Sequence, residues 1–167
     1  EELYCRCNGK TVRILYGPNW VQGSTDDFLE SVAEGAQKHG NLPIHLHTLQ
    51  TPVQKAYGVR KYGKSLVGHL EDLGLVRDNL VLGHAVYLNE GDIELLGAAK
   101  ASVTHHPSCN LATRNGIAPV YHMVRHGVNV CMGIDEKGIN DDEDMFMEMR
   151  MCYFLHRIPS HDLYTPA

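Results

Sequence analysis

The amino-acid sequence predicts an α/β fold that is built on a parallel sheet. Short apolar runs recur five times, and a segment with the hydrophobic spacing of a helix follows each of them. Strands that alternate with helices in this way pair in parallel, with the helices packed against the sheet. The runs cover residues 12–17, 42–49, 79–86, 100–106 and 127–135.

The helical segments have recognisable starts and ends. The first is predicted to begin after Ser24 as N-cap, with acidic residues in its first turn, and to end at Gly40. The second segment is longer, and Gly58 and Gly63 divide it into two pieces. The segments that follow the last four strands cover residues 51–74, 89–100, 116–127 and 140–157.

Length and composition indicate one soluble domain that spans residues 1–167. Apolar residues make up 43% of the chain and charged residues 21%, and the net charge of -5 argues against nucleic acid as a partner. We find neither an apolar run long enough to cross a membrane nor the layout of a secretory signal. Five cysteines, an odd number, indicate reduced thiols and a cytoplasmic protein.

Two architectures fit the alternation: an open doubly wound sheet and part of a (β/α)8 TIM-type barrel. The last strand bears on the choice, because side chains alternate between its two faces. Asn129, Cys131, Gly133 and Asp135 share one face, and apolar residues share the other. A small and polar face opposite an apolar face is typical of a strand that lines a site on one side and meets helices on the other.

Histidines gather at one kind of position in this chain, which contains eleven of them. His47, His84, His105 and Asp135 lie at or near the carboxyl ends of four successive predicted strands. Both architectures place their functional sites at these strand ends. Each residue alone has a structural explanation, but four at equivalent positions favour a site. The five histidines in helical segments are expected at the surface or at helix C-terminal ends: His39, His69, His122, His126 and His156.

Imidazole and carboxylate groups suit a divalent metal ion, either Zn²⁺ or Fe²⁺, that makes hydroxide available near neutral pH. The sequence contains no GxSxG nucleophile elbow and no phosphate-binding glycine loop. Serine-based catalysis is therefore unsupported. A flavodoxin-like binding module remains an alternative, although the turn at 16–24 lacks a recognised phosphate pattern.

Four segments together resemble a known family. They are HLHTLQT, LGHAVYL, SVTHHPSCNLATRNGIAPV and GVNVCMGIDEKGINDDEDMFMEMR, in this order. They resemble the C-terminal half of the amidohydrolase superfamily, in the branch of cytosine deaminase and atrazine chlorohydrolase. The resemblance runs from about residue 12 to 157. It implies a (β/α)8 barrel with one metal ion, of which this chain supplies strands 4 to 8.

The resemblance also implies roles for individual residues. His47 corresponds to the metal ligand of the fifth strand, and Asp135 to the eighth-strand carboxylate that contacts the metal and takes a proton from the attacking water. His84 corresponds to the histidine that orients the hydroxide and polarises the substrate. His105 and Asn110 are expected beside the substrate. His45 is expected in the barrel interior. Trp20 and Gln22, on the loop after the first predicted strand, are candidate substrate contacts.

Two departures from the family pattern have chemical consequences. The His-x-His of the first barrel strand, which supplies two metal ligands, is absent from this chain. We therefore expect a homo-oligomer, or a complementary chain that supplies the missing strands and covers the open sheet edge. The second departure is Gln50, which stands where deaminases of this branch usually have Glu. An amide cannot deliver the proton that a leaving amine needs.

Three functions follow from these expectations. The first is metal-dependent hydrolysis of a carbon-nitrogen bond in a small heterocyclic substrate, with release of ammonia. The second is removal of a halide or alkylamine from a triazine-like ring, which Gln50 favours because a halide needs no proton to leave. The third is a noncatalytic fragment that needs a complementary chain.

Overall fold

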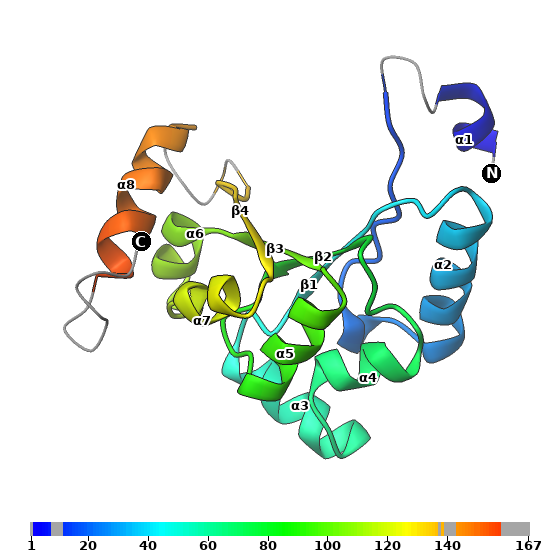
Figure 1. Ribbon diagram of the computed structural model, residues 1–167, viewed down its shortest axis with the longest axis horizontal. Helices are drawn as coiled ribbons and strands as arrows, with labels where there is room; N and C mark the ends of the chain where they lie inside the picture. The colour runs from blue at the N-terminus through cyan, green and yellow to red at the C-terminus, as the bar shows by residue number, and fades with distance from the viewer. Residues whose placement is uncertain (1, 8–11, 137, 139–142, 158–167) are drawn as a thin grey trace.

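The four strands of the protein form one parallel sheet, seen in a computed structural model that describes residues 2–7, 12–136, 138 and 143–157 (Figure 1). The strands are β1 (Ile44–Thr48), β2 (Leu80–His84), β3 (Ser102–His105) and β4 (Asn129–Met132). They are hydrogen-bonded in sequence order, β1-β2-β3-β4, and every neighbouring pair is parallel. The last four predicted strands are thus confirmed.

The first predicted strand, residues 12–17, is reduced to isolated pairings beside β1. Tyr16 pairs with Ile44 and Trp20 with His47, both in parallel. The main-chain hydrogen bonds from His45 N to Tyr16 O and from His47 N to Asn19 O are both 2.9 Å long. The chain therefore enters the sheet at the predicted place, next to β1.

The strand order decides between the two expected architectures. A doubly wound sheet reverses its strand order at a switch point. Here each strand lies beside its predecessor in the chain, from the 16–20 segment through β4. This sequential order is that of a (β/α)8 barrel wall.

Helices cover one face of the sheet and bury its apolar side chains. In β1 the burial alternates, so that Ile44, Leu46 and Thr48 are buried while His45 and His47 are half-buried. The histidines thus share the face opposite the apolar core, as a barrel interior requires. The helices are α1 (Glu2–Cys7), α2 (Asp26–Lys38), α3 (Pro52–Tyr62), α4 (Leu66–Asp72), α5 (Glu90–Ala98), α6 (Pro107–Ala112), α7 (Val120–Arg125) and α8 (Met145–Leu155), with a 3-10 turn, η1 (Val21–Gly23).

Local signals place most helix ends close to the expected positions. Helix α2 begins one residue later than expected, because Thr25 rather than Ser24 accepts the hydrogen bond from Phe28 N. Gly63 ends α3 in the left-handed conformation at φ 70°. His69 lies in the last turn of α4, one of the two expected places, but its side chain is buried, and its Nε2 lies 2.9 Å from Asp26 Oδ1.

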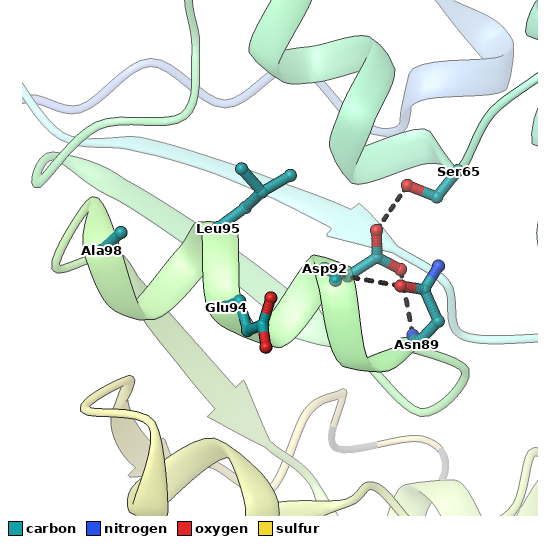
Figure 2. Close-up of a pocket in the computed structure, with 7 residues that line it drawn as sticks. Ser65, Asn89, Asp92, Glu94, Leu95 and Ala98 are labelled. Carbon is teal, nitrogen blue, oxygen red and sulfur yellow. Dashed lines mark hydrogen bonds between the residues drawn. The ribbon is translucent and has the colours of Figure 1, made fainter.

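The capping residues of α4 and α5 are joined to each other. Asn89 and Asp92 form a reciprocal capping box at the start of α5, and Ser65, the N-cap of α4, donates a hydrogen bond to Asp92 Oδ1 (Figure 2). Asp92 is almost fully buried. Ser65, Asn89 and Asp92 also line the pocket drawn in Figure 2. Both oxygens of Asp92 accept hydrogen bonds within this network, so we attribute the polar lining of the pocket to helix capping.

Close packing of α5 against α7 predicts a destabilising substitution. A methyl group on Gly97 would collide with the main-chain carbonyl oxygen of His126. Gly97→Ala is therefore expected to lower the free energy of unfolding by about 1 to 3 kcal/mol, although alanine normally favours a helix. Chemical denaturation measures the change. Gly91→Ala, in the first turn of the same helix, is the control and is expected to cost less, because the added methyl group would lie 3.3 Å from Asn89 Oδ1, a side-chain atom that needs to move by only a few tenths of an ångström.

Helix α8 lies at the β4 end of the molecule (Figure 1). It exposes several apolar side chains. Phe146 is 75% exposed and Phe154 is 64% exposed. Helix α8 contacts α6, and the main-chain N–H of Ser108 donates to Glu148 Oε2 at 3.1 Å. Among the described residues, no helix is both long and apolar enough to cross a membrane.

Candidate active site at the strand ends

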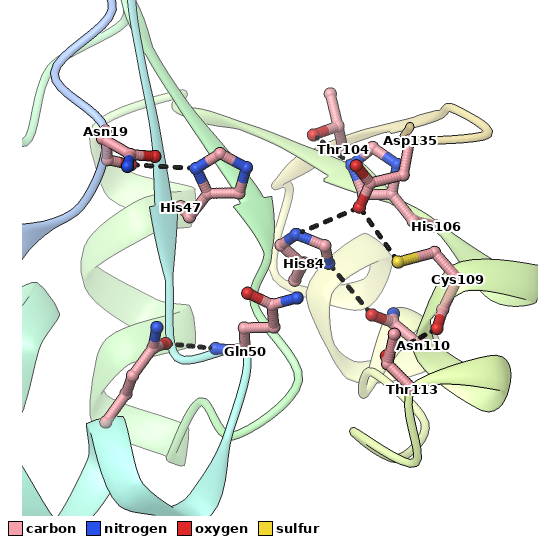
Figure 3. A network of polar contacts seen from close by, with 11 residues as sticks. Asn19, His47, Gln50, His84, Thr104, His106, Cys109, Asn110, Thr113 and Asp135 are labelled. Carbon is pink, nitrogen blue, oxygen red and sulfur yellow. Dashed lines mark hydrogen bonds and ion pairs between the residues drawn. The ribbon is translucent and has the colours of Figure 1, made fainter. Parts of the chain in front are cut away.

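His47 stands at the carboxyl end of β1 with one ring nitrogen already engaged. Its Nδ1 lies 2.9 Å from the main-chain oxygen of Asn19 (Figure 3). A carbonyl oxygen only accepts hydrogen bonds, so Nδ1 carries the proton and Nε2 keeps its lone pair. A hydrogen bond of this kind is how proteins orient a histidine that binds a metal through its other nitrogen.

His84 ends β2 and lies at the centre of the site. Its ring stacks on that of His47 with centroids 5.3 Å apart. Its Nδ1 lies 3.0 Å from Asn110 Oδ1, and its Nε2 lies 3.4 Å from Asp135 Oδ2. Burial lowers the pKa of His84, so the ring is neutral at pH 7 and has one N–H, which either Asn110 or Asp135 can accept.

Asp135 follows β4 and turns its carboxylate toward His84. The Cys109 thiol donates a hydrogen bond to Asp135 Oδ2 at 3.0 Å. Burial alone would raise the pKa of Asp135, but this hydrogen bond and the neighbouring His106 and His84 outweigh it and lower the pKa. The carboxylate is therefore ionised at neutral pH, which is the form that binds a cation or accepts a proton.

The Cys109 thiol should be nearly inert as long as the site is folded. Burial and the hydrogen bond to Asp135 raise its pKa from 9.0 to about 12. At about pH 8 this lowers the thiolate fraction, and hence the rate of alkylation, by about 10³-fold. Peptide mapping after brief treatment with iodoacetamide is expected to find Cys131, which is exposed, modified and Cys109 unmodified. Equal labelling of the two in the native protein would contradict the site geometry; equal labelling after denaturation is the control.

Left-handed backbone conformations recur where the strands end. Leu49, His84, Ala85 and Asp135 have φ angles of 52°, 69°, 49° and 67°. This conformation costs residues other than glycine about 1 to 3 kcal/mol, and such strain concentrates at functional sites. In this chain it accompanies the sharp turns after β1, β2 and β4 and places His84 and Asp135 face to face.

Gln50 is anchored close to the histidines. Its main-chain N–H donates to Gln54 Oε1 at 2.6 Å, and its side-chain amide points toward His84 (Figure 3). An amide at this position can only form hydrogen bonds.

The structure does not bring His105 to the site. His105 shares a face of β3 with the buried Val103, so it points away from the histidine face, and its Nε2 lies 3.3 Å from His156 Nε2. His106, which the sequence analysis missed, takes the expected place, with its ring 4.8 Å from that of His84. Strand alternation was the available signal, because an outward Val103 places residue 105 outward as well.

Of the other three expected site residues, one contacts His84 through its side chain and two do not. Asn110 is buried, and its Oδ1 contacts His84, so in this structure it orients a site residue. Trp20 pairs with His47 through its main chain, but its ring lies against Gly23. Gln22 is half-buried, and its Oε1 has no hydrogen-bond partner among the described residues. Substrate contacts by these three residues stay predictions.

The donor atoms of the site fit a divalent cation. His84, Cys109 and Asp135 offer ligand atoms that lie within 4.8 Å of one another, and His47 Nε2 is oriented by Asn19. His45 lies on the same face of β1, with its ring 6.0 Å from that of His47. Neutral imidazole and an ionised carboxylate are the donors that zinc and similar ions take at catalytic sites.

Comparison with known proteins identifies the family of this chain. The sequence model of the Amidohydrolase family matches residues 1–166. The chain belongs to the amidohydrolase family. The 5'-deoxyadenosine deaminase of Methanosarcina barkeri is 37% identical over 147 residues, which are 88% of this chain and 34% of that protein. The 5-methylthioadenosine/S-adenosylhomocysteine deaminase of Syntrophomonas wolfei is 40% identical over 95% of this chain and 37% of that protein.

Solved amidohydrolase structures share the fold. An adenosine deaminase from Xanthomonas campestris with bound zinc superposes with a TM-score of 0.88 at 32% identity, over 92% of this chain and 35% of that one. The atrazine chlorohydrolase of Arthrobacter aurescens TC1, complexed with zinc, gives a TM-score of 0.86 at 24% identity, over 93% and 35% of the two chains. This chain thus spans about a third of the length of the relatives that it matches.

Proposed function

We propose that this chain forms part of a metal-dependent aminohydrolase that removes the amino group from the purine ring of an adenine nucleoside. The observation that carries the proposal is the convergence of His47, His84 and Asp135 at the ends of three strands. Similarity to deaminases of 5'-deoxyadenosine and 5-methylthioadenosine supports the choice of substrate class.

Within the proposal, His47 Nε2 and Asp135 hold the ion. Zinc is the ion that we propose, with iron as the alternative, because both are compatible with these ligands. When bound, the ion supplies an acidified water and a positive charge beside the ring. Two protein ligands are fewer than the three of a usual catalytic zinc site, so we assign the others to residues outside this chain.

The chain's own residues handle the protons. Asp135, ionised at neutral pH, accepts the proton that the attacking water loses. The neutral His84, fixed by Asn110, holds the oxygen that attacks the ring carbon. Departure of ammonia needs a further proton at the leaving nitrogen, and Gln50 cannot deliver it. Proton delivery is therefore the weakest step of the proposed reaction.

A second candidate function rests on Gln50. Hydrolytic release of a halide from a triazine-like ring needs no proton on the leaving group, so an amide beside His84 suits it. The likeness to the atrazine chlorohydrolase is below 25% identity and supports the shared fold alone. Deamination remains the leading proposal, because the relatives of higher identity are named as deaminases.

We further propose that the active form contains additional barrel strands, supplied by a longer polypeptide, a second copy or a complementary chain. The surfaces that support this are the outer edge of β4, which pairs with no further strand among the described residues, and the exposed apolar side chains of α8. Light scattering of the purified chain is expected to show an assembly larger than a monomer. A stable monomer that releases ammonia would contradict the need for a partner.

The function is tested with a substrate panel on the complete, barrel-forming protein. The panel contains 5'-deoxyadenosine, 5-methylthioadenosine and a chlorinated triazine, and ammonia and chloride are both measured. The proposal expects ammonia from the nucleosides and loss of activity with a chelator, restored by Zn²⁺. Chloride release without ammonia would establish the second candidate. If no substrate of the panel gives ammonia or chloride, the noncatalytic fragment is the function that remains.

A further inference from the structure

A second cluster of metal-binding side chains lies on the helix-covered side of β3. It consists of His105 at the end of β3, Cys152 on α8 and His156, the C-cap residue of α8. Cys152 and His156 are four residues apart, so they share one face of the helix. One ligand atom of each of the three side chains lies within 4.8 Å of the others. The three residues are called the β3–α8 cluster below.

The β3–α8 cluster is separate from the candidate active site. His105 and His106 are adjacent in sequence but point to opposite sides of the sheet. The ring of His106 faces that of His84, whereas the ring of His105 faces that of His156, with centroids 5.3 Å apart.

The distance between the two imidazoles fits a shared ion. His105 Nε2 and His156 Nε2 are 3.3 Å apart. Two nitrogens bound to one tetrahedral zinc, at about 2.05 Å each, are separated by about 3.3 Å. The same distance also allows a weak N–H···N hydrogen bond. Cys152 distinguishes the two explanations, because its thiol has no role in a bond between imidazoles.

The protonation states also suit a metal. Burial lowers the pKa of His105 to about 3, so the ring is neutral and its lone pair is available. Burial and Glu148 raise the pKa of Cys152, so without an ion the thiol keeps its proton. Coordination would release that proton to solvent as the thiolate binds, and the affinity for metal would rise with pH.

We propose that His105, Cys152 and His156 bind a transition-metal ion of the zinc class and thereby fasten α8 to the end of β3. Two imidazoles and a thiolate are a donor set that Zn²⁺ and Co²⁺ prefer over Mg²⁺ or Ca²⁺. Cys152 is half-buried, so a water can complete the coordination from the solvent side. The ion would tie α8 to β3, in addition to the contacts that α8 makes with α6, including the Ser108 hydrogen bond.

Titration of the purified full chain with Co²⁺ alone tests the site. A cobalt-thiolate bond gives a near-ultraviolet charge-transfer band that imidazole and carboxylate ligands do not give. We expect the band to saturate at one equivalent of Co²⁺ and to disappear when one equivalent of Zn²⁺ is added. Cys152→Ala and His156→Gln are expected to abolish the band at the same Co²⁺ concentration. Glutamine at position 156 keeps an acceptor for His105, so that variant preserves a merely structural contact.

Two further cysteines provide matched controls. Cys109→Ser removes the thiol beside Asp135, and Cys131→Ser removes the exposed thiol of β4. Both variants are expected to keep the band. The proposal is overturned if the wild-type chain gives no thiolate band, or if the band survives Cys152→Ala and is lost with either control. Far-ultraviolet circular dichroism of each variant confirms that the helices are retained, which separates loss of a ligand from loss of the fold.

Discussion

Asp135→Asn is expected to lower the deamination rate of the complete protein by about 10²-fold to 10⁴-fold, the usual loss when a general base is removed. The substitution keeps the size of the side chain and its hydrogen bond with Cys109, but an amide neither accepts the proton of the attacking water nor neutralises a cation. The measurement is kcat for ammonia release under saturating Zn²⁺.

The neighbouring Glu136 offers the matched control. Glu136→Gln makes the same chemical change one residue further on, at an exposed side chain. It is expected to leave kcat nearly unchanged. If Asp135→Asn retained full activity with zinc bound, the carboxylate at the end of β4 would have no part in the reaction.

Gln50→Glu is expected to have an effect of similar size in the opposite direction. A carboxyl group at this position, next to His84, can carry a proton to the leaving nitrogen, so ammonia release from 5'-deoxyadenosine should rise by about 10²-fold to 10⁴-fold. Chloride release from a halogenated ring should not rise, because that leaving group needs no proton. The two products are measured on the same variant.

Gln37→Glu, on the exposed side of α2, introduces the same charge away from the site and serves as the control. Ammonia release that stays at the wild-type rate in Gln50→Glu would show that another group already delivers the proton. In that case the amide of Gln50 does not limit ammonia release, and the second candidate function, halide release, loses the observation on which it rests.

The fold could be predicted because its signals are local. Alternating apolar runs and helical segments give the strands in order, and the segments expected to start at residues 51 and 89 start at the observed N-caps Thr51 and Asn89. The reduced pairing of residues 12–17 could not be predicted, since it depends on how much of a neighbouring strand is present rather than on the apolar run itself.

The positions of candidate site residues could be predicted where a strand end fixes them, and less well where a turn or the packing of a helix fixes them. His47, His84 and Asp135 were expected together, and they are. His105 was expected beside the substrate, but strand alternation places it on the same face as the buried Val103, and the adjacent His106 lies near His84 instead. Cys109 has no sequence signal of its own, because its contact with Asp135 depends on the packing of α6 against the end of β4.

His47 and His84 differ in whether a main-chain or a side-chain atom orients them, and so in how easily a mutation disturbs that orientation. His47 is oriented by the main-chain oxygen of Asn19, which every amino acid possesses, so position 19 can drift in evolution without disturbing the imidazole. His84 is oriented by the side chain of Asn110, and a single codon change there removes the contact. Inherited loss of function in this protein should therefore arise at position 110 far more readily than at position 19.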